Sequence, residues 1–333
     1  MTDDREPYTL SVAPMMDWTD RHCRFFHRLM TRHTLLYTEM ITAKALIHGD
    51  RASLLAFHPA EHPLALQLGG SIPSELGQAA AFGAQAGYDE INLNAGCPSE
   101  RVQSGYFGAA LMKEPLLAGE CARAMIESSL GTEVTVKCRI GVDDQVPIDA
   151  LAEFIQSVGS AGVKRVAIHA RKAWLKGLSP KENREIPPLD YGVADRMRNY
   201  FPELKLVVNG GIGSLETAEE FLERGFSGAM IGRAAYRSPG DILLEADRRI
   251  FGSANKPPRR TEIARTMLSY AEGHVAAGGR LSQVLRHLAG LFNGIPGSRH
   301  WKRCLAEKSE GDLSKIRSLD KAIGSFEMNP ELI

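Results

Sequence analysis

Eight short apolar runs, several of them rich in β-branched residues, recur through the first 235 residues and restrict the fold more than any other feature of the sequence. Between most of them lie Ala- and Leu-rich stretches with helical spacing. Two of these stretches, 74–87 and 214–225, end in glycine, as helices often do, and Ser214 is a suitable helix start. Eight strands alternating with helices predict a parallel sheet closed into a TIM (β/α)8 barrel. The runs span residues 10–16, 35–40, 64–70, 90–96, 134–140, 165–170, 204–211 and 228–233.

An open, doubly wound sheet is the alternative architecture for this alternation. It is less favoured because no G-x-G-x-x-G motif follows the first run. The segment 238–252 has the pattern of the last barrel helix, and 253–260 (SANKPPRR) has the composition of a linker. We therefore expect a barrel domain over residues 1–252.

Residues 253–333 have a purely helical pattern after the linker and predict a small helical bundle. One helix is expected from Thr261 and a second from Ser282. The second carries a single apolar stripe. The stripe consists of Leu281, Leu285, Leu288 and Phe292.

The balanced charge of the chain, 40 basic and 40 acidic residues, conceals an asymmetry. Residues 256–303 hold nine Lys and Arg against two acidic side chains. Such a segment favours a polyanionic partner, although a solvated helical face would have the same composition. No apolar run approaches the length of a membrane span, and the first residues, MTDDREPYTL, lack the apolar core of a secretory signal.

The five cysteines include no C-x-x-C pair, which argues against a structural zinc site or a disulfide framework. We expect a cytoplasmic protein without a metal. Cys97 differs from the other four because it follows the fourth run in the tight loop N-L-N-A-G-C-P-S. Its thiol could act as a proton donor or, once ionised, as a nucleophile. The others lie within helical or strand patterns and are interpreted as small apolar side chains of the core.

Polar residues gather at the carboxyl ends of the predicted strands, where the active sites of this fold lie. Their concentration predicts a large polar ligand, because buried polar groups need partners. Lys137 could form a Schiff base or stabilise an anionic ring, and His169 lies on the neighbouring strand. The glycine-rich ends of the last two strands predict a phosphate site, with Arg233 as a bidentate partner. The residues at these ends are Gln67, Asn92, Asn94, Cys97, Lys137, Arg139, His169, Asn209, Gly210, Gly211, Gly232 and Arg233.

At these residues the sequence closely resembles the tRNA-dihydrouridine synthase family. The motif APMMDWTD (13–20) and the long segment 169–184 are most similar to the subfamily that acts at D-loop positions 20 and 20a. The resemblance extends into the helical tail. The matching segments are 13–20, 37–46, 66–70, 90–112, 136–144, 168–189, 207–212, 230–236 and 287–303.

The resemblance implies an FMN enzyme that uses NADPH to reduce the C5–C6 double bond of a tRNA uridine to dihydrouridine. In such an enzyme hydride passes from flavin N5 to C6, and Cys97 gives a proton to C5. The uracil must leave its stack to reach the flavin. The implied flavin contacts are Pro14, Met15, Met16, Gln67, Lys137, His169, Asn209, Gly210, Gly211, Gly232 and Arg233.

The resemblance also implies residues that contact tRNA: Asn94 for the flipped base, with Lys181, Arg184, Arg299 and Lys302 for orienting the RNA. We expect a monomer. Two other functions remain open from the sequence. One is a flavin barrel that acts on a free small molecule, as dihydroorotate dehydrogenases do, and the other is a non-redox RNA-binding protein on a barrel without activity.

Overall fold

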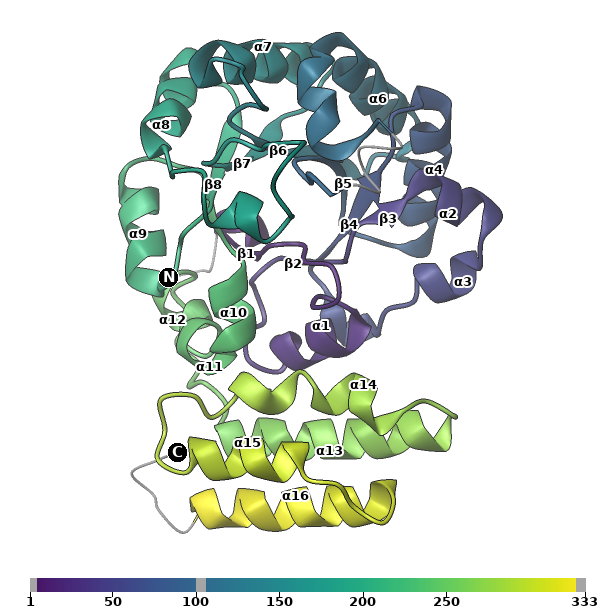
Figure 1. Cartoon of the computed structure of the whole chain (residues 1–333), viewed down its shortest axis with the longest axis vertical. Coiled ribbons are helices and arrows are strands. Elements are labelled where there is room, and N and C mark those ends of the chain that lie inside the picture. The colour runs from purple at the N-terminus through teal and green to yellow at the C-terminus, as the bar shows by residue number, and fades with distance from the viewer. Residues whose placement is uncertain (1–4, 100–105, 328–333) are drawn as a thin grey trace.

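The computed structural model describes residues 5–99 and 106–327, and within them one parallel sheet closes into a barrel (Figure 1). The hydrogen-bonded order is β1-β9-β8-β7-β6-β5-β4-β2, and β3 also pairs with β4. A parallel bridge between Ser11 and Leu35 joins β1 to the chain beside β2 and completes the ring. The TIM-barrel prediction is therefore confirmed. The strands are β1 Leu10–Val12, β2 Leu36–Tyr37, β3 Ile41–Thr42, β4 Leu64–Gly69, β5 Glu90–Ala95, β6 Glu133–Arg139, β7 Arg165–His169, β8 Lys205–Asn209 and β9 Gly228–Ile231.

Helices surround the sheet, and their ends follow the local sequence signals. Gly87 ends α4 in the left-handed region at φ +91°, as the glycine signal predicts. Ser214 caps α9 by accepting a hydrogen bond from the Thr217 N–H. The barrel helices are α1 Arg21–Arg28, α2 Ala43–His48, α3 Arg51–Leu54, α4 Pro73–Ala86, α6 Pro115–Ser128, α7 Pro147–Ser160, α8 Tyr191–Tyr200, α9 Leu215–Glu223, α10 Arg233–Arg237, α11 Pro239–Ile242 and α12 Ala246–Arg249.

The prediction of a single helix over 238–252 was wrong, because the structure has two short helices, α11 and α12, in that segment. The bend between them lets the Asp247 carboxylate reach the loop after α1. There it accepts hydrogen bonds from the Thr31 hydroxyl at 2.5 Å and the Arg32 N–H at 2.7 Å. This long-range contact accompanies two short helices in place of the continuous helix that the apolar spacing predicts.

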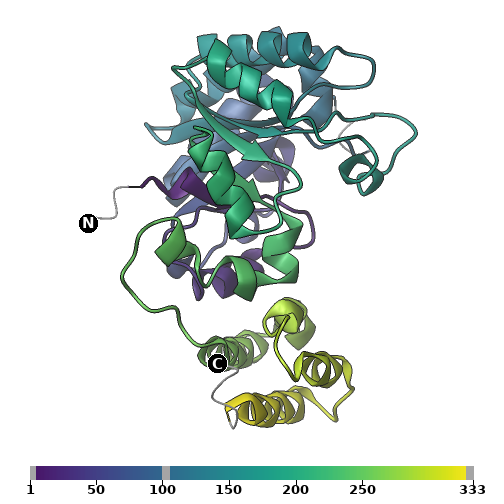
Figure 2. The same cartoon turned by 90° about the vertical axis from the view of Figure 1, so that its left-hand side faces the viewer.

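The tail is a bundle of α13 Arg260–Ala276, α14 Leu281–Leu285, α15 Ser298–Ala306 and α16 Asp312–Glu327, which lies beside the barrel in Figures 1 and 2. The helix expected from Ser282 ends at Leu285, and a 3-10 turn follows at Leu288–Gly290. Gly290 packs on the barrel backbone so closely that a Cβ there would lie 2.4 Å from the Arg237 carbonyl oxygen. The predicted apolar stripe is nevertheless buried.

Polar and aromatic contacts attach the tail to the barrel. The Asp20 carboxylate caps α1 through the Cys23 N–H at 2.9 Å and also pairs with Arg286 and His287 of the tail. Phe25 of α1 stacks on Tyr270 of α13 with ring centroids 4.4 Å apart. One continuous apolar core contains residues of both parts. The barrel and its tail are therefore joined over a packed interface.

A chain of hydrogen bonds runs through the barrel interior from its carboxyl to its amino end. Asn94 donates to Gln67 at 2.7 Å, Gln67 donates to Asn92 at 2.8 Å, and Asn92 donates to Thr135 at 2.8 Å. Thr135 then donates to the carboxylate of Glu90. These side chains share the interior with a small apolar cluster of Tyr8, Ala13, Leu35, Tyr37, Ala65, Ala167, Val207 and Met230.

The amino end of the interior is closed by a buried ion pair. Arg165 donates to Glu90 at 2.7 Å and to the more exposed Glu133 at 2.6 Å, and its guanidinium lies 4.1 Å from the centroid of the Tyr8 ring. Tyr37 donates to the same Glu90 carboxylate at 2.6 Å. The Arg165 and Glu90 side chains are both almost fully buried. Removing either one would leave the other charge buried without its partner.

We predict that Arg165→Met lowers the free energy of unfolding by about 3–5 kcal/mol, because it leaves Glu90 buried without its counter-charge. Thermal and urea unfolding of both proteins measure the effect. Arg248→Met, which breaks an exposed pair with Glu245, is the control and should change stability by less than about 1 kcal/mol. Equal stability of the Arg165 variant and the wild type would contradict the prediction.

Candidate active site at the barrel mouth

The loop after β5 holds Cys97 at the carboxyl end of the barrel. The Asn94 side-chain oxygen accepts hydrogen bonds from the N–H groups of Gly96 at 3.1 Å and Cys97 at 3.0 Å. Arg139 donates to the Gly96 carbonyl at 3.0 Å, and the Ala109 N–H donates to the Cys97 carbonyl at 2.9 Å. The partly exposed Cys97 side chain is thus carried on a backbone fixed from both sides.

Lys137 pairs in register with Asn94 and so points to the same interior face of the barrel. Burial, reinforced by the nearby Arg139 guanidinium, lowers the pKa of Lys137 to about 8. None of the described residues accepts a hydrogen bond from its ammonium group. A cation in this position is suited to an anionic or strongly polar ligand.

His169 lies at the end of β7, in register with Arg139 and Asn209. Burial and the positive charges of Arg139 and Lys137 hold the pKa of His169 well below its usual range. The imidazole is therefore neutral at physiological pH. It can donate one hydrogen bond and accept another without adding charge to the site.

The ends of β8 and β9 form a tight backbone cradle next to His169. Gly210 has φ +109°, and a Cβ there would lie 2.6 Å from the His169 ring. Gly211 has φ +71°, and a Cβ there would lie 2.5 Å from a methyl group of Leu189. Asn209 donates to the Met230 carbonyl at 2.7 Å and ties the two strand ends together. Only glycine, which lacks a Cβ, allows the backbone to lie so close to the side chains of His169 and Leu189.

Arg233 follows this cradle at the start of α10. Its guanidinium pairs with the Glu185 carboxylate at 2.8 Å, a contact that the sequence did not predict. Both side chains are partly exposed, so the pair is open to solvent. An incoming phosphate would compete with Glu185 for the guanidinium.

The loop after β1 lies across the mouth from Lys137 and contributes Pro14, Met15 and Met16. Thr19 fixes it, accepting from the Met15 N–H at 3.0 Å while its own N–H donates to the Met15 carbonyl at 3.0 Å. A Cβ at Gly232 would lie 3.7 Å from the Met15 sulfur, which places this loop beside the end of β9. The Met16 side chain is half exposed.

Two residues important to this arrangement were given no role by the sequence or its resemblance. Arg139 donates to the Asn183 carbonyl at 2.8 Å and to the Lys172 carbonyl at 3.0 Å, in addition to Gly96. It therefore joins the cysteine loop to the loop after β7. The fully buried Asn183 organises that second loop through its side-chain amide. The sequence indicated Arg139 as a polar residue at the end of a predicted strand. No pattern in the sequence marks Asn183.

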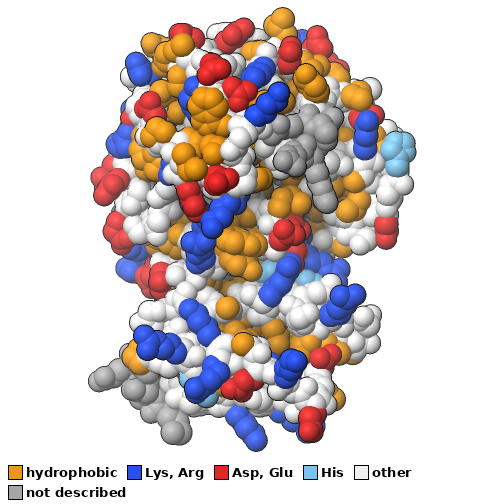
Figure 3. Space-filling view, viewed as in Figure 1, with side chains coloured by type: hydrophobic (Ala, Val, Ile, Leu, Met, Phe, Trp, Pro, Cys, Tyr) orange, Lys and Arg blue, Asp and Glu red, His pale blue; other side chains and the backbone are white. Residues whose placement is uncertain are grey.

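The remaining candidate residues lie on the surface around the mouth and on the tail. Lys181 and Arg184 are exposed in the loop that Asn183 organises, and Arg299 and Lys302 are exposed on α15. None of these four forms an ion pair within residues 5–99 and 106–327. Figure 3 shows Lys and Arg side chains both near the centre of this barrel face and over the tail.

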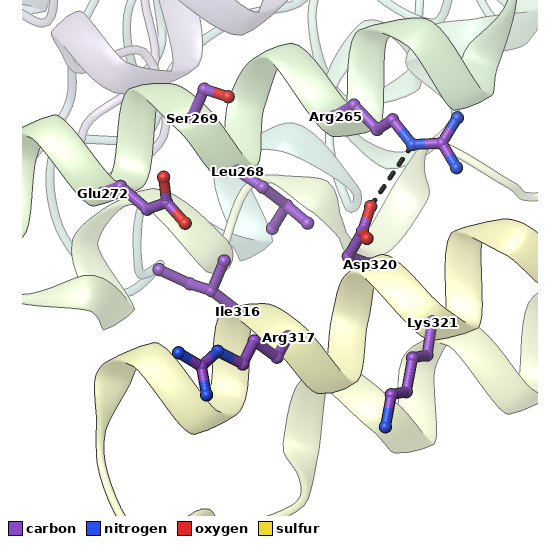
Figure 4. Close-up of a pocket in the computed structure, with 8 residues that line it drawn as sticks. All are labelled: Arg265, Leu268, Ser269, Glu272, Ile316, Arg317, Asp320 and Lys321. Atoms are coloured by element: carbon purple, nitrogen blue, oxygen red, sulfur yellow. Dashed lines mark hydrogen bonds and ion pairs between the residues drawn. The ribbon is translucent and has the colours of Figure 1, made fainter.

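A separate groove of about 400 Å³ lies in the tail between α13 and α16 (Figure 4). Arg265 pairs there with Asp320 at 3.2 Å, and Arg317 and Lys321 line the other side. The groove shares no residue with the barrel mouth. It is therefore not part of the candidate active site.

Residues 11–326 match the model of a protein family described as dihydrouridine synthase. The chain belongs to this family. It is 51% identical over 318 residues to the tRNA-dihydrouridine(20/20a) synthase of Vibrio vulnificus (strain CMCP6), covering 95% of this chain and 96% of the relative. The enzyme of the same name from Escherichia coli (strain K12) is 51% identical over 314 residues, covering 94% and 90%.

Two solved structures share the fold of this dihydrouridine synthase family member at low sequence identity. An old yellow enzyme homologue from Zymomonas mobilis aligns with a TM-score of 0.52 and 13% identity over 74% of this chain and 89% of that one. Morphinone reductase in complex with tetrahydroNAD aligns with a TM-score of 0.50 and 13% identity over 75% and 88%. At this identity the likeness supports the barrel fold alone.

None of the described helices is long and apolar enough to cross a membrane. In the described part of the chain, no three His, Cys, Asp or Glu side chains come together in a way that could hold a metal ion.

Proposed function

We propose that this member of the dihydrouridine synthase family reduces the C5–C6 double bond of uridine in tRNA to 5,6-dihydrouridine, at D-loop positions 20 and 20a. The observation that carries the proposal is the joint placement of Cys97, Lys137 and the glycine cradle at one barrel mouth. Its relatives of about half-identical sequence bear the name of this reaction and these positions. Incubating the protein with unmodified tRNA and NADPH, and measuring dihydrouridine at each position, tests it.

The residues at the mouth fit FMN as the cofactor. The Lys137 ammonium, which donates to none of the described residues, suits the electron-rich end of a flavin ring. The neutral His169 and the Gln67 amide can supply further hydrogen bonds. The glycine cradle suits the ribityl–phosphate end because its backbone carries no side chains and has the positive φ values of a tight turn. The proposed contacts are Pro14, Met15, Met16, Gln67, Lys137, His169, Asn209, Gly210, Gly211, Gly232 and Arg233.

When bound and reduced by NADPH, FMN supplies the hydride that uracil accepts at C6. The protein must then deliver a proton to C5, and Cys97 is the donor that we assign to this step. Its fixed loop holds the Cys97 backbone in place at the mouth, which favours a directed proton transfer. The sulfur that loses this proton lies near the Lys137 and Arg139 cations.

Asn94 has two proposed roles at this site. Its side-chain oxygen already holds the Cys97 loop, and one of its amide protons is bound to Gln67. The second amide proton is left to contact a carbonyl oxygen of the flipped uracil. A change at Asn94 therefore acts on both the base and the proton donor.

The tRNA is proposed to lie across the mouth and the tail. Lys181 and Arg184 would contact it on the barrel, and Arg299 and Lys302 on α15, each through its exposed cationic group. In this arrangement residues 1–252 are the FMN-binding catalytic domain and residues 253–333 the tRNA-binding domain of a cytoplasmic monomer. A purified protein with a flavin spectrum would exclude a non-redox RNA-binding role, and activity on free uridine would favour a small-molecule reductase.

Cys97→Ala is expected to lower dihydrouridine formation on the order of 10²–10⁴-fold, because the C5 proton loses its donor. FMN content and NADPH oxidation should persist, since neither requires that proton. Cys121→Ala, at a buried cysteine of α6, is the matched control and should retain product formation. Near wild-type product from the Cys97 variant at neutral pH would remove this residue from the mechanism.

FMN affinity is expected to be constant below about pH 8 and to fall as the pH rises above it. The pKa of Lys137 in the unliganded protein is about 8, and a bound flavin that needs the ammonium raises this pKa. Binding must therefore take up a proton at higher pH, which weakens it. Titrating apoprotein with FMN between pH 7 and 9.5 measures the effect. In Lys137→Met the affinity should be lower at pH 7 and independent of pH over this range, and a wild-type profile in that variant would contradict the assignment.

The double variant Arg299→Ala/Lys302→Ala is expected to bind tRNA more weakly while its flavin spectrum stays unchanged. The slope of log affinity against log salt should flatten by about 0.7–0.9 for each phosphate that the protein no longer neutralises. Binding measured at several salt concentrations gives this slope. Arg317→Ala/Lys321→Ala, beside the α13–α16 groove, removes the same charge from another helix and should leave both quantities unchanged. Equal slopes for both double variants would mean that α15 does not dock the RNA.

A further inference from the structure

Trp174 is a large aromatic side chain exposed at the rim of the barrel mouth, and the proposed function does not yet use it. Its side chain is 38% exposed, although most large apolar residues of the chain are buried. It lies five residues beyond His169, in the loop after β7. Its near neighbours along the chain are the cationic residues Lys172 and Lys176. The loop therefore carries an exposed aromatic ring between two cationic residues of the sequence.

The backbone at Trp174 is rigid. Its N–H donates to the Asn183 side chain at 2.7 Å, and its carbonyl accepts from the same amide at 2.9 Å. On one side Ala173 bridges to Val142, which extends the pairing of β6 and β7 above the mouth. On the other side the Leu175 N–H donates to Asp143 at 2.8 Å. The backbone that carries the indole is therefore fixed, so little backbone entropy is lost when a ligand stacks on the ring.

Cationic groups near the indole favour a partner that carries negative charge. The Lys172 ammonium lies 5.5 Å from the centroid of the ring. The exposed Lys176 and Lys181 form no ion pair within the described ranges. An exposed aromatic ring with one ammonium group near it, in a lysine-rich loop, matches a partner with aromatic rings joined by phosphates. Single-stranded RNA has this chemistry.

We propose that Trp174 is a stacking platform for an unpaired nucleobase of the tRNA, adjacent to the uridine that enters the mouth. This inference rests on the proposed function and adds a specificity-determining residue to it. Stacking is tolerant of sequence, because every base has a π-face. When the RNA shifts by one nucleotide, a base can still cover the indole. Trp174 thereby allows one active site to serve two neighbouring uridines, such as positions 20 and 20a.

The test compares Trp174→Ala, Trp174→Phe and wild-type holoenzyme on an unmodified tRNA transcript. Tyr200→Ala is the matched control, because Tyr200 is also exposed and lies at the end of α8, beside the amino end of the barrel. For Trp174→Ala we expect KM for tRNA to rise on the order of tenfold, with the flavin spectrum and NADPH oxidation unchanged. Trp174→Phe should retain most of the affinity, and Tyr200→Ala all of it.

A second substrate identifies the contacted group. In a transcript with an abasic nucleotide on either side of the target uridine, wild type and Trp174→Ala should bind equally, because the base that stacks is absent. A wild-type KM for Trp174→Ala on normal tRNA would overturn the proposal. An equal weakening on normal and abasic transcripts would also overturn it, since the ring would then contact protein or backbone. Failure of the proposed function itself would appear differently, as no dihydrouridine from the wild type on any transcript.

Discussion

The chain of hydrogen bonds inside the barrel, from Asn94 to Arg165, is the interaction on which the rest of the site depends. A barrel interior is normally filled by apolar side chains, and each polar group placed there must be satisfied. Here every amide both donates and accepts, and the chain ends on the Glu90–Arg165 ion pair. Because Asn94 is the last member at the mouth, its side-chain oxygen is held where it fixes the Cys97 loop. The position of the thiol is thus supported by contacts that begin at the opposite end of the barrel.

The tail is coupled to the same site through the loop after β1. Asp20 follows the Met15–Thr19 turn directly and binds Arg286 and His287 of the tail. Trp18 of that turn stacks on Tyr236 of α10 at 4.4 Å, and the Tyr236 hydroxyl lies 3.2 Å from a ring nitrogen of His287. A shift of the tail would therefore move the side chains that border the proposed flavin site. The packed interface makes the orientation of the tail part of the active-site geometry.

The sequence could predict most strands because they are short apolar runs, and those from β4 to β8 also carry polar residues of the site. The resemblance placed candidate roles on residues that the structure does bring to one mouth, including Lys137, His169 and the glycines after β8. Contacts between residues far apart in the chain could not be predicted from local sequence patterns. The break between α11 and α12 depends on Asp247 reaching the Thr31 loop, and the end of α14 accompanies the packing of Gly290 on the Arg237 carbonyl. The partners of Arg139 and the role of Asn183 depend on loops that meet only in the folded chain, so neither has a local signature.

The electrostatics of the mouth suit both proposed ligands, the cofactor and the RNA. Arg139 is buried and donates its hydrogen bonds to three neutral carbonyl oxygens. Together with Lys137, Arg171 and Arg184 it surrounds His169 with positive charge, which adds to burial in keeping that imidazole neutral. The nearby Glu185 is already paired with Arg233. Lys137 and Arg139 are buried, and neither pairs with a carboxylate of the described residues. Such cations are unfavourable in the free protein, so an anionic ligand that enters the site would relieve this unfavourable free energy. A cofactor phosphate at the glycine cradle and an RNA backbone across the rim would both neutralise this charge. The same excess of cations thus favours both ligands of the proposed reaction.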